Sequence, residues 1–482
     1  MDLVNGAPAP MTLEELEAVM ARLVPEWHKQ LASAESVDSW LRPNSARGFD
    51  IPKKASPEHR RLAELARTPW LGLVVTNVAQ AMYVDNIVRG PGNNPEDTPG
   101  GQDRALWELW VQNGMASHQI SNHRAMVSYG QSFSVTTPAV LDGVDTARIR
   151  CLSPKRMVVE WLDPATDVYP QYALEAITHT ANNTQWRLYD SHYRYTLVND
   201  RTTSGKYRLE GHPFHHGVGE VPVIRFANML DLDGNVTGEV TPFIPTASRI
   251  NKTAYDRLLA QHFNSWKTRT ISGLDLPQDD NPDVERAETE AFKVRMAQED
   301  ILVSEDTETR FGVLDGTSLD TYVSAWRSDI EALAAVSQTP AHALTGQLVN
   351  LNAEALAAAR APLTQKVWER QVNAGLGYSR TLRLAASLTG LNDQAADPLV
   401  RVTWQDMEIR SMSQAVDALG KAATMLDIPK RGLWPRIPGV ERSDIELWED
   451  LAAQDREADP LNSVLRRHSQ ANETPADVSG EA

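Results

Sequence analysis

The chain has 482 residues, of which 41% are hydrophobic, so it can bury a large core and is longer than one simple domain usually is. Its formal net charge is −17, which argues against a protein built to grip nucleic acid, because phosphate binding needs a basic surface. The single cysteine, Cys151, excludes disulfides within the chain, and we expect neither a signal peptide nor a membrane span, because no basic start precedes an apolar run and no apolar run approaches eighteen residues.

The first part of the chain is predicted to be helical. Thr12 and Glu15 have the spacing of a capping box, and TLEELEAVMARLVPEW then reads as an amphipathic helix. The mostly apolar run from Leu71 to Val88 predicts a buried helix. Residues 90–101 predict a loop by their Gly, Pro and Asn content, and Gly130 is placed to end a later helix as its C-cap.

The pattern then changes to short runs that alternate in polarity or are β-branched, with Asp, Asn, Gly and Pro between them. These runs predict strands, and they are SFSVTTPAVL, ARIRCLSP, RMVVEWLDP, YALEAIT, WRLYDSHYRYTLV, YRLE and VPVIRFAN.

From Thr241 the helical period returns. One apolar stripe predicts a helix, and it consists of Ile250, Ala254, Leu258, Leu259 and Phe263. Further helices are expected over 318–337, over 353–388, where thirty-six residues would span about 54 Å, and within MSQAVDALGKAATM and SDIELWEDLAAQ. The tail ANETPADVSGEA has the composition of a disordered segment.

Two stretches have unusual charge. Residues 275–310 hold twelve acids and four bases, a net charge of −8. Between Gln338 and Ala353 there is no Lys, Arg, Asp or Glu, although 23% of the chain is charged. A loop bearing Pro340 and Gly346 should lie on a wet surface, so this neutrality needs an explanation.

The sequence offers little for catalysis. ALGKA at 418–422 lacks the first Gly and the Ser/Thr of a phosphate-binding loop, which argues against a nucleotide motor. His212, His215 and His216 would make an incomplete metal site and are interpreted as surface loop histidines, and Cys151 as a core residue. The thirteen tryptophans could indicate a sugar-binding surface, but core packing is favoured, because Trp107, Trp110, Trp161 and Trp448 lie on apolar stripes or strands. The composition favours a structural or interaction protein, and a cytosolic hydrolase with a carboxylate pair and a Trp-lined cleft stays open as the alternative.

Several pieces together resemble the portal proteins of tailed phages, of the siphophage type found in actinobacterial phages. ALWELWVQNGM, HRAMVSYGQSFSVTTP, RCLSPKRMVVEWLDP and GEVPVIRFANMLD are similar to successive segments of that family. The resemblance is strongest in SQTPAHALTGQLVNLNAEALAAARAPLTQKVWERQ, WQDMEIRSMSQAVDALGKAATM and WPRIPGVERSDIELW, and it covers about Leu71 to Leu451 in the family's order. GEVTPFIP departs from the usual Gly-x-Ser before the first stem helix.

The resemblance implies a non-enzymatic α+β subunit with no cofactor, in a ring normally of twelve at one capsid vertex of the virion, assembled in the host cytoplasm. It also implies the division of the chain: 1–242 as wing, 243–271 and 316–337 as stem helices, 272–315 as clip, 338–352 as tunnel loop, 353–390 as a long helix behind it, and 391–482 as crown and flexible C-terminal tail. The implied partners are the terminase large subunit, a head–tail adaptor, the major capsid and scaffolding proteins, and the double-stranded DNA that passes through the channel.

This division offers a reason for the neutral loop. A ring of bases would grip phosphate tightly, and a ring of carboxylates would repel DNA at close range. Neutral side chains avoid both outcomes at a constriction, and the expected tunnel residues are Gln347, Leu348, Val349, Asn350, Leu351 and Asn352. The last of these is also placed to cap the long helix.

Residues 243–271 have a net charge of +4, from bases at Arg249, Lys252, Arg257, Lys267 and Arg269. We expect these bases to pair with acids of the neighbouring subunit, at about 0–1 kcal/mol for each exposed pair. The acidic clip would suit partners with basic docking faces, and its candidate residues are Asp279, Asp280, Asp283, Glu285, Glu288 and Glu290.

Overall fold

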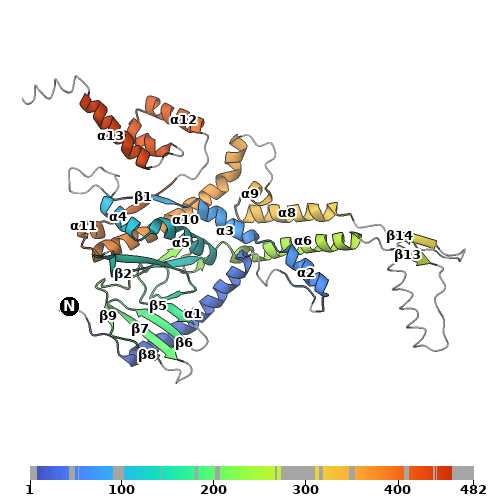
Figure 1. Cartoon of the computed structure of the whole chain (residues 1–482), viewed down its shortest axis with the longest axis horizontal. Coiled ribbons are helices and arrows are strands. Elements are labelled where there is room, and N and C mark those ends of the chain that lie inside the picture. Colours follow the sequence, from blue (N-terminus) through green and yellow to red (C-terminus); the bar gives the residue numbers. More distant parts are fainter. Residues whose placement is uncertain are drawn as a thin grey trace, which may run out of the picture. The chain divides into compact units, whose positions relative to one another are not determined.

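A computed structural model describes residues 8–42, 49–52, 54–90, 103–141, 143–179, 183–200, 207–265, 269–272, 310–313, 318–346, 353–405, 412–437, 440 and 442–458 (Figure 1). The chain divides into two compact units, Met1–Thr403 and Trp404–Ala482.

The helices of the first unit are α1 (Leu13–Leu41), α2 (Pro57–Ala66), α3 (Trp70–Gln80), α4 (Arg104–Gln112), α5 (Met115–Tyr129), α6 (Ile244–Ser265), α8 (Asp320–Val336), α9 (Ala341–Thr345), α10 (Ala353–Leu388) and α11 (Asn392–Ala396), with a 3-10 turn at Thr241–Phe243 before α6. Its strands are β1 (Val84–Val88), β2 (Gln131–Leu141), β3 (Val144–Leu152), β4 (Met157–Glu160), β5 (Tyr172–His179), β6 (Asn183–Tyr189), β7 (Tyr193–Asp200), β8 (Tyr207–Leu209), β9 (Phe214–His215), β10 (Val223–Ala227), β11 (Met229–Leu230), β12 (Val236–Thr237), β13 (Arg269–Ser272) and β14 (Arg310–Val313). β15 (Arg401–Trp404) pairs with β1 at the boundary of the units.

The six-stranded sheet has the order β4-β5-β6-β7-β8, with β9 paired to β7, and α1 packs across one of its faces. The capping box starts α1 as expected, with Thr12 accepting from the amide of Glu15. Buried α1 residues such as Leu16 and Trp27 then meet Leu174 of β5 and Trp186 of β6 in one apolar cluster. The helix therefore buries the apolar residues that recur about every 3.6 positions, and the strands bury every second residue against it.

The opposite face of this sheet meets a three-stranded antiparallel sheet of order β10-β2-β3. Ala173, next to Leu174 on β5, packs with Phe133 of β2 and Val223 of β10. Ser132 and Ser134, which alternate with Phe133, face the helices instead, and Ser134 bonds Thr381 of α10 at 2.7 Å. The first unit is therefore layered as α1, large sheet, small sheet, and then α5 with α10.

A buried carboxylate joins the two sheets. Glu175 of β5 has no exposed side-chain surface and bonds Arg150 of β3 at 2.7 Å, Arg156 at 3.2 Å and the hydroxyl of Tyr189 at 2.9 Å. Burial acts to raise the pKa of Glu175, but hydrogen bonding and attraction from Arg150 lower it below its usual value. The carboxylate is thus held ionised between the sheets.

Helix α10 lies against the small sheet because Gly377 lets the two backbones approach closely. A Cβ atom at position 377 would lie 2.7 Å from the ring of Phe226 on β10. The next residue, Tyr378, is buried and bonds His123 of α5 at 3.0 Å and Asn122 at 3.3 Å. The thirty-six-residue α10 therefore contacts both the small sheet and α5.

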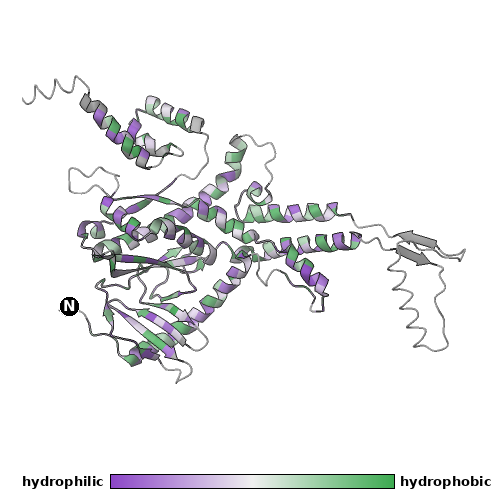
Figure 2. Cartoon of the chain, viewed as in Figure 1, coloured by the Kyte–Doolittle hydropathy of each residue, from purple (hydrophilic) through white to green (hydrophobic). Residues whose placement is uncertain are grey.

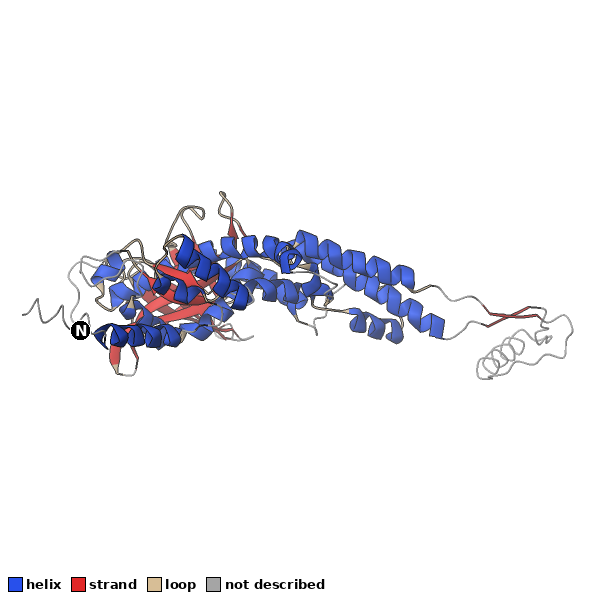
Figure 3. Ribbon diagram, turned by 90° about the horizontal axis from the view of Figure 1, so that it is seen from above, coloured by secondary structure: helices blue, strands red, loops and turns tan. Residues whose placement is uncertain are grey.

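Helices α6 and α8 run side by side and antiparallel (Figures 1 and 3), and both carry apolar and hydrophilic residues along their length (Figure 2). Ala254 and Tyr255 of α6 bury against Ala63 and Ala66 of α2. Beyond the helix pair, β13 and β14 form a two-stranded antiparallel ladder. The expectation of helix up to residue 271 is therefore wrong at 269–271, because these residues, with β-branched Thr270 and Ile271 among them, pair as a strand.

Two further sequence predictions need correction. The apolar run 71–88 is not one helix: α3 ends at Gln80, and 84–88 form β1, whose amide at Val84 bonds Gln119 of α5. WRLYDSHYRYTLV forms two strands, β6 and β7, because Asp190 accepts hydrogen bonds from the amides of His192 and Tyr193 and so makes a turn.

The second unit contains α12 (Met412–Met425), a 3-10 segment over Lys430–Arg436 and α13 (Arg442–Ala458). Trp434 and Trp448 meet edge to face, with ring centroids 5.8 Å apart. These helices agree with the predictions from MSQAVDALGKAATM and SDIELWEDLAAQ. In the described part of the chain no helix is both long and apolar enough to cross a membrane.

Candidate functional site

The bases expected on the first stem helix have contacts within their own chain. Arg249 of α6 pairs with Asp329 of α8 at 2.8 Å, and Thr253 donates to the same carboxylate at 2.8 Å. Arg257 lies over the ring of Trp326, 5.1 Å from its centroid. These contacts connect α6 to α8, and the structure does not test pairing with another subunit.

The remaining bases of this set are placed differently. Lys252 pairs with Asp256 one turn along α6. Arg269 belongs to strand β13 rather than to the helix, and Lys267 lies outside the described residues.

The structure describes the first part of the neutral loop, residues 338–346. After α8, Gln338 adopts a left-handed conformation with φ of 53°, and the short α9 follows. Gly346 ends α9 with φ of 68°, where a residue without a Cβ is favoured. The six expected tunnel residues, Gln347, Leu348, Val349, Asn350, Leu351 and Asn352, lie outside the described residues. The six expected clip acids, Asp279, Asp280, Asp283, Glu285, Glu288 and Glu290, lie outside them too.

A buried ion cluster lies at the base of this loop, and the sequence interpretation missed it. Glu239, just before α6, pairs with Lys366 of α10 at 2.6 Å and with Arg370, one turn later, at 2.9 Å. Lys366 also donates to the carbonyl of Ser337, the last residue of α8, at 2.8 Å. Asn228 donates to Glu239 at 3.3 Å. We call Glu239, Lys366 and Arg370 the ion cluster.

The ion cluster fixes three elements at one point. The side chains of Lys366, Arg370 and Glu239 are 3%, 6% and 5% exposed, so water screens their attraction little. Burial acts to raise the pKa of Glu239, but Lys366 and Arg370 lower it below its usual value, so the carboxylate stays ionised. Burial lowers the pKa of Lys366, and Glu239 opposes that shift.

The sequence did contain a signal for this cluster. Lys366 and Arg370 are one turn apart and lie on the face of α10 that buries Leu363 and Val367. Two bases on an apolar face require a buried acid, because an unpaired buried charge is costly. The sequence does not reveal which acid it is, since Glu239 is more than a hundred residues away.

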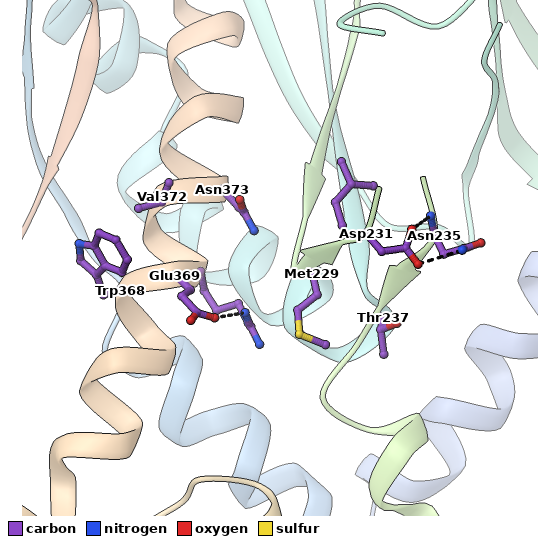
Figure 4. Close-up of a pocket in the computed structure, with 10 residues that line it drawn as sticks. Met229, Asp231, Asn235, Thr237, Trp368, Glu369, Val372 and Asn373 are labelled. Carbon is purple, nitrogen blue, oxygen red and sulfur yellow. Dashed lines mark hydrogen bonds and ion pairs between the residues drawn. The ribbon is translucent and has the colours of Figure 1, made fainter. Parts of the chain in front are cut away.

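A groove of about 450 Å³ lies between α10 and the β11–β12 hairpin (Figure 4). Met229 and Leu230 line it from the hairpin, and Trp368 and Val372 from α10. The carboxylate of Asp231 accepts hydrogen bonds from the backbone amide and the side-chain amide of Asn235, at 2.7 and 2.9 Å.

The other residues singled out by sequence are mostly structural. His216 is 1% exposed rather than a surface residue, because its ring fits between the carbonyl of Asp190, 3.0 Å from Nε2, and the amide of Val218, 3.3 Å from Nδ1. Within the described residues no group of three metal-binding side chains occurs. Burial raises the pKa of the half-buried Cys151 to about 12, which disfavours the nucleophilic thiolate.

Comparison with known proteins gives one family. Residues 22–460 match the family model described as "Phage portal protein, SPP1 Gp6-like". No curated protein matches significantly. Among solved structures, the chain is similar to one described as "Neck of native GTA particle computed with C12 symmetry", at 11% identity and a TM-score of 0.43, over 82% of this chain and 96% of that one.

Proposed function

Since the chain belongs to the SPP1 Gp6-like phage portal protein family, we propose that it forms a closed ring at one vertex of the capsid, through which DNA is packaged and ejected. The family match over 22–460 carries this proposal. The ring would bring no chemistry of its own, and the packaging motor would be another chain. A ring of identical subunits needs two different surfaces that fit one another, repeated by rotation until the ring closes.

Each part of the chain would then have a place in the ring. Residues 1–242 would form the wing, α6 and α8 the stem, and 272–315 the clip that meets the terminase large subunit and the head–tail adaptor. Residues 338–352 would form the tunnel loop, α10 the helix behind it, and 391–482 the crown. The antiparallel contact of α6 with α8 supports the stem assignment, since the segment between them starts and ends at the same end of the pair.

The neutral loop would line the narrowest part of the channel. The ion cluster supports this, because the bond from Lys366 to Ser337 joins the two helices between which the loop runs. A loop whose start is fixed in this way can present neutral side chains to DNA without a strong phosphate grip. Isolated subunits should accordingly bind duplex DNA weakly.

The stem bases would act mainly within a subunit. Arg249 and Arg257 already have partners on α8, so ring cohesion would come chiefly from apolar surfaces. Reversing the charge of both residues should disturb the helix pair more than it changes the salt dependence of the ring.

Sedimentation or electron microscopy of the purified protein tests the proposal. A ring many times heavier than one 53.4 kDa chain is expected. A stable monomer at all concentrations, or a nanomolar, salt-resistant complex of monomer and DNA, would contradict it. The hydrolase alternative gains nothing from the groove, because hydrogen bonds to Asn235 occupy the Asp231 carboxylate.

A further inference from the structure

An apolar stripe runs along the outside of α10. Trp368, Val372 and Leu376 follow one another at intervals of four residues, which places them on one side of the helix. They are 58%, 53% and 52% exposed, although nearby positions of α10 are buried. Side chains of this size rarely remain exposed in a row without a partner.

The stripe continues across the groove onto the hairpin. Met229 and Leu230 line the groove opposite Trp368 and Val372 (Figure 4), and Leu232 in the turn is 97% exposed. The six side chains together expose roughly 600 Å² of surface, which is at the upper end for the largest patch of an ordinary monomer. We call these six residues the α10–hairpin patch.

A neighbouring loop extends the patch and gives it an acidic rim. Gly234 has φ of 82°, and a Cβ there would lie 2.7 Å from Pro164, so the hairpin turn packs directly on the loop that contains Leu162. Leu162 is 84% exposed. Carboxylates lie on the same segments: Asp231 and Glu369 line the groove, Asp233 is in the hairpin turn next to Leu232, and Asp163 and Asp167 follow Leu162. Arg370 at the groove is buried and pairs with Glu239 and Glu369.

We propose that the α10–hairpin patch is the surface on which a second copy of this chain docks, with apolar and basic side chains. The proposal rests on the proposed ring, because a closed ring needs one patch and a different, complementary patch on every subunit. The chain offers such groups elsewhere: on α2, Arg61 and Leu65 are one turn apart and both are exposed, and the helix also carries the exposed Glu58 and Glu64, so the positive charge would come from its arginines. The acidic rim of the α10–hairpin patch would attract basic side chains of such a surface, and its apolar centre would bury apolar ones.

The test compares Val372→Asp with a matched control. Val372 is half exposed, so an aspartate there is solvated in the folded subunit and becomes buried only when the second copy docks. We expect a folded V372D chain whose association is weaker on the order of a hundredfold. Val111→Asp makes the same change at a 60% exposed helical site on α4 and should leave the ring intact. Circular dichroism and thermal unfolding confirm folding, and sedimentation gives the mass.

The acidic rim gives an independent readout. Asp233→Lys should weaken the ring, and added salt should reduce the difference from wild type, since the lost attraction is electrostatic. A V372D ring of normal mass and stability, with or without a defect in capsid assembly, overturns the second-copy assignment. A wild-type chain that stays monomeric overturns the proposed function as well, so the two failures are distinguishable.

Discussion

Removing the carboxylate of Glu239 should be among the most damaging single changes in the described part of the chain. Glu239→Gln keeps the size of the side chain but leaves Lys366 buried without an anion, and it leaves Arg370 with only the half-exposed Glu369. Breaking a buried ion pair from one side costs about 3–5 kcal/mol. The bond from Lys366 to Ser337 remains, so the loss stems from the unpaired charges and not from a missing contact.

Chemical denaturation followed by circular dichroism measures this loss, with hydrogen exchange to localise it. Exchange in E239Q should rise first at the end of α8 and in the middle of α10, since the cluster joins these segments. Glu26→Gln is the control, because Glu26 pairs with Lys29 at an exposed site where side chains are 57% and 73% accessible. That change should cost about 0–1 kcal/mol.

The dependence on pH separates charge from packing. The pKa of Glu239 is below its usual 4.5 in the folded chain, so its contribution is present above pH 4.5 and is lost as the pH falls through the folded value. In E239Q, Lys366 keeps a depressed pKa without its anion. The E239Q deficit should therefore shrink as the pH rises toward 10.5, the ordinary value for lysine.

Replacing all three residues of the ion cluster by apolar residues should cost much less stability than E239Q alone. Such replacements of buried ion groups are often neutral or stabilising by about 1–4 kcal/mol. If E239Q cost less than about 1 kcal/mol, or if its deficit did not change with pH, the reasoning from an unpaired buried charge would be refuted.

Three smaller predictions concern other parts of the first unit. Burial lowers the pKa of His123 and of His216 to about 4, so folding stability should fall between pH 6.5 and 4 by up to about 3 kcal/mol for each, and replacing both by Gln should flatten that part of the urea-midpoint profile. Gly377→Ala should cost about 1–3 kcal/mol in thermal unfolding because its Cβ meets the Phe226 ring, and Phe226→Leu should recover part of the loss; an unchanged melting temperature would contradict the close approach. Asp329→Asn should cost only about 0–1 kcal/mol, since its arginine partner on α6 is 57% exposed, and a larger loss would mean that the helix pair depends on this contact.

The sequence predicted elements that short-range patterns determine. The capping box at Thr12, the C-cap at Gly130 and the thirty-six-residue α10 were all readable within one or two turns. The end of α3 at Gln80 was not, because 84–88 become a strand only by pairing with β15, more than three hundred residues later. Charge partners are equally distant in the sequence, which is why the sequence did not reveal that Arg249 pairs with Asp329 of α8.

The ion cluster and the neutral loop follow one electrostatic requirement in the proposed channel. Fixing the start of the loop needs a strong interaction, and here Lys366 of α10 supplies it through its hydrogen bond to the carbonyl of Ser337. A polyanion passing nearby would bind Lys366 and Arg370 if they were exposed, but both are buried and Glu239 partly neutralises their charge. Neutral side chains at 347–352 alone would not keep DNA mobile; the cations that hold the loop must also be withdrawn from the channel. An E239Q subunit that folded but gained salt-sensitive DNA binding would show that this withdrawal depends on the carboxylate.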